Sequence, residues 1–108
     1  MIAVAIAAAI SSAPVSDVAA WQTGNDLLRF CTTPRSSDAC FGYIERVADA
    51  MADGVPLFGR RACIPAGADA GQIRDVAVRY LESRPDIRHG SAAQLAAIAY
   101  SEAFPCPR

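Results

Sequence analysis

Apolar residues recur along this chain at intervals of three and four positions, the spacing that places side chains on one face of an α-helix. The clearest stretch carries Cys40, Ile44, Val47 and Met51 on one such face. No stretch alternates polar and apolar residues as a half-buried β-strand does. The pattern therefore predicts an all-α protein, a small bundle of about four helices.

Capping residues indicate where three of these helices begin. A Ser, Thr or Asp at the N-cap and an acid or amide three residues later can together bond the free N–H groups of a first helical turn. We expect such pairs at Thr23 with Asp26, Asp69 with Gln72, and Ser91 with Gln94.

The remaining helix is expected to run from about residue 38 or 39 to Met51, and it contains Gly42. A glycine inside a helix costs up to about 1 kcal/mol relative to alanine. A glycine kept at such a position usually marks a close approach by a neighbouring backbone. We therefore expect another helix to cross at Gly42.

The first twenty residues differ in composition from the rest of the chain. Residues 2–10 are all apolar and residues 11–13 are small, as in a secretory signal peptide. We expect residues 1–20 to be a leader cleaved near residue 13 or 20, and residues 21–108 to be the helical domain. After cleavage near residue 20, Trp21 is expected to pack at the start of the domain. The alternatives are a transmembrane anchor, which needs roughly 20 apolar residues, and an apolar N-terminus on a cytosolic protein.

The chain has four cysteines, Cys31, Cys40, Cys63 and Cys106. In a small exported domain, an even number of cysteines indicates disulfides, here two with three possible connectivities. Zinc is the competing use of four cysteines, but the sequence has no Cys-x-x-Cys pair and its spacings match no zinc knuckle. We therefore expect a domain stabilised by two disulfides.

The expected helix layout favours one of the three connectivities. Cys31 ends the first helix and Cys40 begins the second, so a short turn brings them together. Cys63 lies just before the third helix, and Cys106 lies just after the fourth, which returns antiparallel to the third. Pairing Cys31 with Cys40 and Cys63 with Cys106 is the least strained choice. In the chain-entropy treatment these bonds contribute roughly 3 and 4 kcal/mol.

Charge and polar residues argue against several functions. The formal net charge is −1 and the ten basic residues, all arginines, are dispersed, which does not favour nucleic acid or an anionic membrane as a partner. The only histidine, His89, has Asp86 nearby in sequence but lacks the further partners that catalysis or a metal would need. Oxidised cysteines would leave no thiolate nucleophile. We therefore predict a protein that is not an enzyme and holds no metal or cofactor.

One segment between the second and third helices has the composition of a binding loop. Residues 53–61 bring Leu57, Phe58, Arg60 and Arg61 together with two glycines, and aromatic and arginine side chains are over-represented among binding hot spots. We take these four residues as candidates for partner binding. The alternative is that Leu57 and Phe58 pack in the core while the arginines are merely solvated. The turn at residues 84–90 is a second candidate contact.

Several segments also form an ordered set along the chain. They are Leu27-Leu28-Arg29-Phe30-Cys31, Cys40-Phe41-Gly42-Tyr43-Ile44, Ala48-Asp49-Ala50, Cys63-Ile64-Pro65, Gln72-Ile73-Arg74-Asp75-Val76, Tyr80-Leu81, Arg84-Pro85 and Ala103-Phe104-Pro105-Cys106. In this order they resemble the Rap/Tai immunity family of type VI secretion systems, over about residues 22–106.

The resemblance implies a fold and a function. Members of that family are small periplasmic all-helical proteins, generally homodimers, and those with a known role bind and block secreted peptidoglycan amidase effectors. The resemblance therefore implies an amidase effector as the partner, with no membrane association once the leader is removed. The alternative is a general periplasmic helper or binding protein of the same fold that has no amidase partner.

Overall fold

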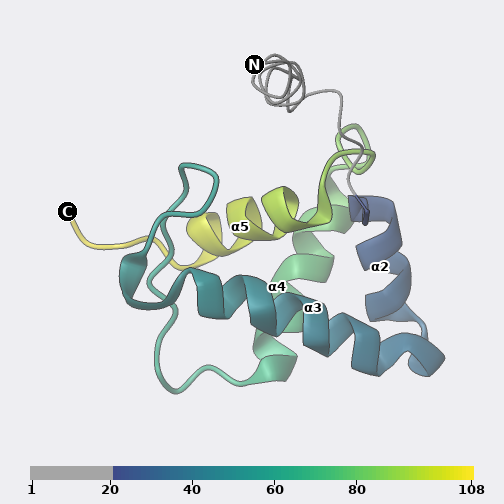
Figure 1. Cartoon of the computed structure of the whole chain (residues 1–108), viewed down its shortest axis with the longest axis horizontal. Coiled ribbons are helices and arrows are strands. Elements are labelled where there is room, and N and C mark those ends of the chain that lie inside the picture. The colour runs from purple at the N-terminus through teal and green to yellow at the C-terminus, as the bar shows by residue number, and fades with distance from the viewer. Residues whose placement is uncertain (1–20) are drawn as a thin grey trace, which may run out of the picture.

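The computed structural model describes residues 21–108 (Figure 1), so the predicted leader and its cleavage sites lie outside the described residues. The described part is helical and contains no β-strand, only two isolated bridges. Two short 3-10 turns, η2 (Pro34–Ser36) and η3 (Ala52–Gly54), precede and follow the second helix. The predicted all-α class is confirmed, with the helices α2 (Gly24–Thr32), α3 (Ser37–Ala50), α4 (Ala70–Ser83) and α5 (Ala92–Ala103).

The predicted N-caps are present. Thr23 accepts a hydrogen bond from the Asp26 N–H at 3.2 Å, and Asp26 in return accepts from the Thr23 N–H at 2.9 Å. Asp69 and Gln72 form the same reciprocal pair at the start of α4. Ser91 accepts from the Gln94 N–H at the start of α5, but the expected return bond from the Ser91 N–H to the Gln94 side chain is not formed. Local side-chain chemistry therefore sets where three helices begin.

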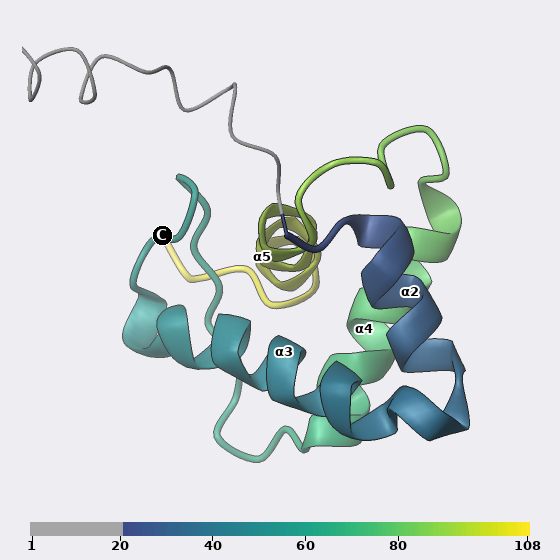
Figure 2. The same cartoon turned by 45° about the vertical axis from the view of Figure 1, so that its right-hand side comes forward.

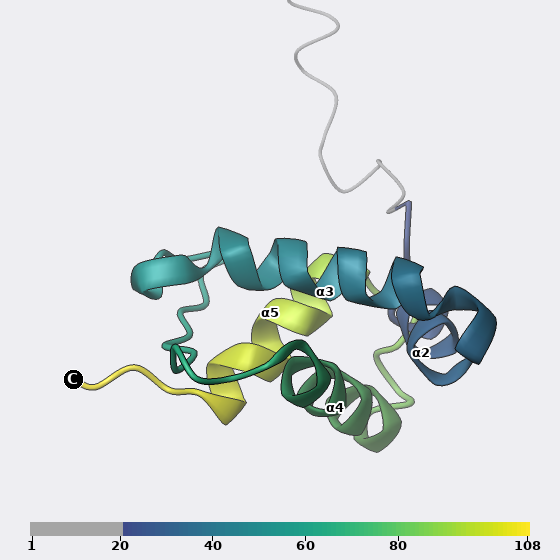
Figure 3. The ribbon, with the colours of Figure 1, turned by 90° about the horizontal axis from the view of Figure 1, so that it is seen from below.

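The four helices share one core, and each of them contacts the other three. Figures 2 and 3 show α5 lying against α3 on one side and α4 on another. Five side chains at the centre are almost fully removed from solvent: Leu27, Ile44, Met51, Leu81 and Tyr100. Four alanines of α5, at positions 92, 96, 97 and 99, are also buried, and their small side chains let neighbouring helices approach closely.

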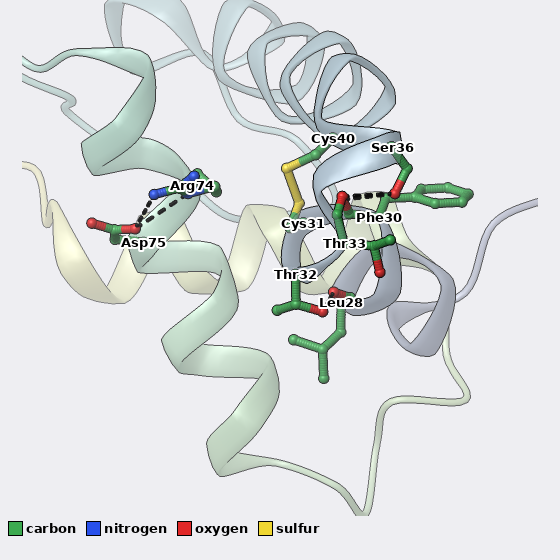
Figure 4. The surroundings of a disulfide bond; sticks show 9 residues. All are labelled: Leu28, Phe30, Cys31, Thr32, Thr33, Ser36, Cys40, Arg74 and Asp75. Atoms are coloured by element: carbon green, nitrogen blue, oxygen red, sulfur yellow. Dashed lines mark hydrogen bonds and ion pairs between the residues drawn. A yellow bond between two sulfur atoms is a disulfide. The ribbon is translucent and has the colours of Figure 1, made fainter.

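Both predicted disulfides are present in the structure. Cys31 at the end of α2 bonds Cys40 in α3, with Cα atoms 4.9 Å apart (Figure 4). Cys63, before α4, bonds Cys106 in the tail after α5, again with Cα atoms 4.9 Å apart. The first bond closes the corner between two consecutive helices, and the second joins segments that are distant in sequence.

The prediction that a helix crosses at Gly42 is wrong. A methyl group built on Gly42 would meet no atom within 4 Å, and the residue is exposed. The close approach is at Gly24 instead, where a methyl carbon would lie 2.5 Å from Leu95 Cδ1 and 2.9 Å from the Arg88 carbonyl oxygen. The start of α2 therefore requires a glycine because α5 and the preceding turn press against it.

The expected packing role of Trp21 is also wrong, because 95% of this residue is exposed. The next residue, Gln22, is held to the domain, since its carbonyl oxygen accepts a hydrogen bond from the Ala92 N–H. None of the helices within residues 21–108 is long and apolar enough to cross a membrane.

Candidate functional site

The segment after α3 forms a hairpin that projects from the helices beside the C-terminal tail (Figures 1 and 2). Its arms are joined by reciprocal backbone hydrogen bonds between Leu57 and Arg60, of 2.8 and 2.9 Å. The two residues between them, Phe58 and Gly59, both have positive φ, 52° and 74°. Positive φ at both central positions is what a two-residue type I′ turn requires. We call residues 55–61 the binding loop, because they contain the four candidate residues for partner binding.

Phe58 occupies the tip of the binding loop in a strained conformation. Turns of this kind favour Asn, Asp or Gly at the first central position, because a bulky side chain is strained at positive φ. The cost for an ordinary L-residue is about 1 to 2 kcal/mol. Burial of the side chain does not offset this cost, since 53% of Phe58 is exposed.

The other three candidates take different positions. Leu57 is partly buried and packs against the core cluster. Arg60 is exposed. Arg61 uses its Nε to donate a hydrogen bond to the Gly54 carbonyl oxygen, 2.9 Å away, at the base of the loop. The ion pairs found within residues 21–108 involve neither Arg60 nor Arg61. The structure thus places one apolar and one cationic side chain at the exposed tip, with a second cation at the base.

An apolar groove of about 620 Å³ adjoins the binding loop. Most of its lining comes from α3, and the rest comes from the loop and from the start of α5. Burial raises the pKa of Tyr43 in this lining, and a backbone hydrogen bond from Ala93 opposes that rise. The groove is lined by Ala39, Gly42, Tyr43, Arg46, Val47, Ala50, Leu57, Phe58 and Ala93.

Sequence reasoning missed the groove as part of the site. Its α3 residues recur at helical spacing beside the buried face, and the exposed Gly42 lies among them. That spacing was the available signal. From the sequence alone, these residues could not be distinguished from the buried face of α3, because that distinction depends on which neighbouring elements cover the helix. We refer to the binding loop and this groove together as the loop–groove surface.

The second candidate contact, the turn at residues 84–90, has a structural role in the fold. The carbonyl oxygens of Arg88 and Gly90 accept hydrogen bonds of 2.9 Å from the first N–H groups of α2. Arg84 holds Asp86 with two hydrogen bonds of 3.1 Å, which lowers the pKa of the Asp86 carboxyl. His89 is exposed on this turn.

The described residues offer little for chemistry or metal binding. Within residues 21–108, no group of three or more His, Cys, Asp or Glu side chains is placed to hold a metal ion. All four cysteines are in disulfides, so none supplies a thiolate. What the structure does present is a projecting apolar tip beside an apolar groove, an arrangement suited to binding another macromolecule.

Comparison with known proteins identifies the family. A sequence model of the Rap1a immunity proteins matches residues 23–106. The chain belongs to the Rap1a immunity protein family. The match covers nearly the whole described domain, and it confirms the family inferred from the ordered segments. No curated protein and no solved structure matches the chain.

Membership in the Rap1a immunity family defines the general function. Immunity proteins act against secreted effectors by binding them, so this is a family of inhibitors that is not typically enzymatic. Such a role requires a rigid scaffold and an exposed contact surface and does not require catalytic groups. The two disulfides agree with an exported protein, because such bonds persist in oxidising compartments.

Proposed function

We propose that this chain is a periplasmic immunity protein that binds and inhibits a peptidoglycan amidase effector delivered by type VI secretion. The observation that carries the proposed binding mode is the exposed, strained Phe58 at the tip of the binding loop. Strain of this kind persists only where the surrounding structure imposes it, and it is concentrated at ligand contacts and active sites. The resemblance to amidase-binding immunity proteins supplies the class of effector.

The shape of the binding loop supports inhibition by occlusion. A two-residue turn is the narrowest hairpin end, so it can enter a cleft that a helix cannot. The reciprocal hydrogen bonds between Leu57 and Arg60 hold the tip in one conformation before binding, which lowers the entropy lost on association. We propose that Phe58 enters the active-site cleft of the effector and blocks substrate access.

The remaining parts of the loop–groove surface would surround this anchor. Arg60 provides a cation beside Phe58 that can pair with a carboxylate of the effector at the rim of the contact. The groove along α3 offers apolar area next to the tip. We also propose that the protein acts as a homodimer, as the resemblance implies.

The first experiment is to co-purify the mature protein, expressed in the periplasm, with the product of the neighbouring gene. The proposal predicts a stoichiometric complex in which that partner no longer cleaves peptidoglycan. Light scattering on the free protein and on the complex measures the number of copies of each chain. Broad, weak binding to unfolded proteins without a specific partner would instead support the general periplasmic helper.

Single substitutions then test the contact. Phe58→Ala is expected to weaken effector binding about thirtyfold, as for a hot spot worth about 2 kcal/mol, and Arg60→Ala is expected to weaken it less. Arg35→Ala is the matched control, because Arg35 is an exposed arginine in η2, at the opposite end of α3 from the loop. If both loop variants bind like the wild type, the interface lies elsewhere on the protein.

A further inference from the structure

Both ends of the binding loop converge on Gly54. Arg61 in the returning arm donates from Nε to the Gly54 carbonyl oxygen at 2.9 Å. A methyl group built on Gly54 would lie 3.1 Å from Arg61 Nη2 and 3.7 Å from Cys63 Sγ. The guanidinium group and the sulfur atom therefore both lie against the same buried glycine, which has a φ of 74°.

Cys63 connects this point to the other end of the fold. Its N–H donates a hydrogen bond of 2.8 Å to the Phe104 carbonyl oxygen, just after α5. Its sulfur is bonded to Cys106. Figures 1 and 2 show the C-terminal tail running beside the binding loop. The base of the loop is thus attached to the segment after α5 by one hydrogen bond and one covalent bond.

Beyond its base, the binding loop has few attachments to the helices. The backbone hydrogen bonds of Leu57 and Arg60 join the two arms to each other. Val55 and Phe58 are each more than half exposed, and only Leu57 packs partly against the core cluster. A segment with few buried contacts has low local stability. The direction in which the tip points must therefore be set largely by the base.

We propose that Arg61 and the Cys63–Cys106 disulfide are positioning groups for the binding loop, so that the chain presents Phe58 in its most productive position when this disulfide is formed. This inference rests on the effector-binding role proposed above for the loop. The chain would consequently gain its full inhibitory capacity on oxidation in an exporting environment, and the same chain with free thiols would be a weaker inhibitor.

The chemistry of the switch is ordinary thiol–disulfide exchange. A dithiol reductant attacks one sulfur of the Cys63–Cys106 bond through a thiolate and forms a mixed disulfide, which releases the other cysteine as a thiol. The second thiol of the reductant then displaces the first cysteine. The reductant leaves as a disulfide, and the protein gains two electrons and two protons as two thiols. Oxidation by a dithiol–disulfide carrier reverses both steps.

The test follows amide hydrogen exchange in the binding loop and needs no effector. In the double variant Cys63→Ala/Cys106→Ala, the amides of Leu57 and Arg60 are expected to exchange about tenfold or more faster than in the wild type, because their local opening is easier. The matched control is Cys31→Ala/Cys40→Ala, which removes the disulfide at the remote corner and is expected to leave the exchange of these two amides unchanged. Equal loop exchange in the two folded variants would overturn the proposal.

A second pair of variants keeps both disulfides, in case the cysteine variant does not fold. Arg61→Met retains the aliphatic part of the side chain but removes the donor to Gly54. It is expected to speed the same two amides and to weaken effector binding about tenfold through a positioning defect. Arg60→Met, one residue away, is expected to leave the exchange unchanged. If Arg61→Met exchanges like Arg60→Met, Arg61 does not position the loop.

The two readouts separate this proposal from the proposed function. Faster loop exchange without any change in effector affinity would retain the positioning of the loop and reject its role in effector binding. Unchanged exchange together with the loss of binding in Phe58→Ala would retain the binding role and reject the positioning device.

Discussion

At the scale of single residues, Phe58 has a conformational cost that its own contacts in the fold do not offset. Its positive φ costs free energy that its half-exposed side chain does not recover in the core. Asn tolerates this conformation and is preferred in type I′ turns. Phe58→Asn is therefore expected to raise the free energy of unfolding by about 1 kcal/mol, measured by urea denaturation.

The same substitution is expected to weaken effector binding, because it removes the apolar anchor. Opposite signs for stability and affinity would identify Phe58 as a residue retained for contact. Phe58→Ala serves as the control, since it removes the ring without relieving the backbone strain to the same extent. If Phe58→Asn loses both stability and affinity, this interpretation is wrong.

The sequence selected four candidate residues in this loop but did not reveal the contacts that each of them makes in the fold. Composition alone selected Leu57, Phe58, Arg60 and Arg61, and the structure places all four in one hairpin. Composition could not reveal that Leu57 packs partly inward, or that Arg61 bonds a carbonyl seven residues earlier. Those features depend on backbone angles and on contacts that arise only after the chain has folded.

At the scale of helices, local signals predicted boundaries well and predicted crossings poorly. The capping pairs that begin α2, α4 and α5 involve residues three positions apart, so they can be identified in the sequence. α3 was expected from residue 38 or 39 to 51 and runs from 37 to 50. The close contacts at Gly24 come from α5, from the turn before it and from Leu81 of α4, and no local pattern marks them.

The glycine that begins α2 and the glycine within α3 give a matched pair of substitutions. Gly24→Ala is expected to lower the free energy of unfolding by about 1 to 3 kcal/mol, because the new methyl group would collide with Leu95 and with the Arg88 backbone. Gly42→Ala has open space and is expected to raise it by up to about 1 kcal/mol through helix propensity.

Thermal or urea unfolding of both variants checks this assignment. Opposite changes are the expected result, since one glycine is required by packing and the other is not. If Gly42→Ala also destabilises the protein, a contact covers that face in solution, and the groove beside the binding loop would be the first place to look for it.

At the scale of the whole molecule, the two disulfides bear on stability and on binding in different ways. Their sequence separations of 9 and 43 residues predict contributions of roughly 3 and 4 kcal/mol, which are large for one small domain. Removing either one is therefore expected to lower the free energy of unfolding by a similar amount. Urea denaturation of the two double alanine variants measures this directly.

The two disulfides are expected to differ in their effect on effector binding. Cys31–Cys40 closes the corner between α2 and α3, whereas Cys63–Cys106 lies at the base of the binding loop. If the second bond acts only through global stability, both folded variants will bind the effector almost equally at temperatures well below their unfolding. If it also positions the loop, the Cys63→Ala/Cys106→Ala variant alone will lose affinity, by about tenfold. Titration of both variants with the effector at low temperature separates these outcomes, because the population of unfolded chains is then too small to produce such a loss.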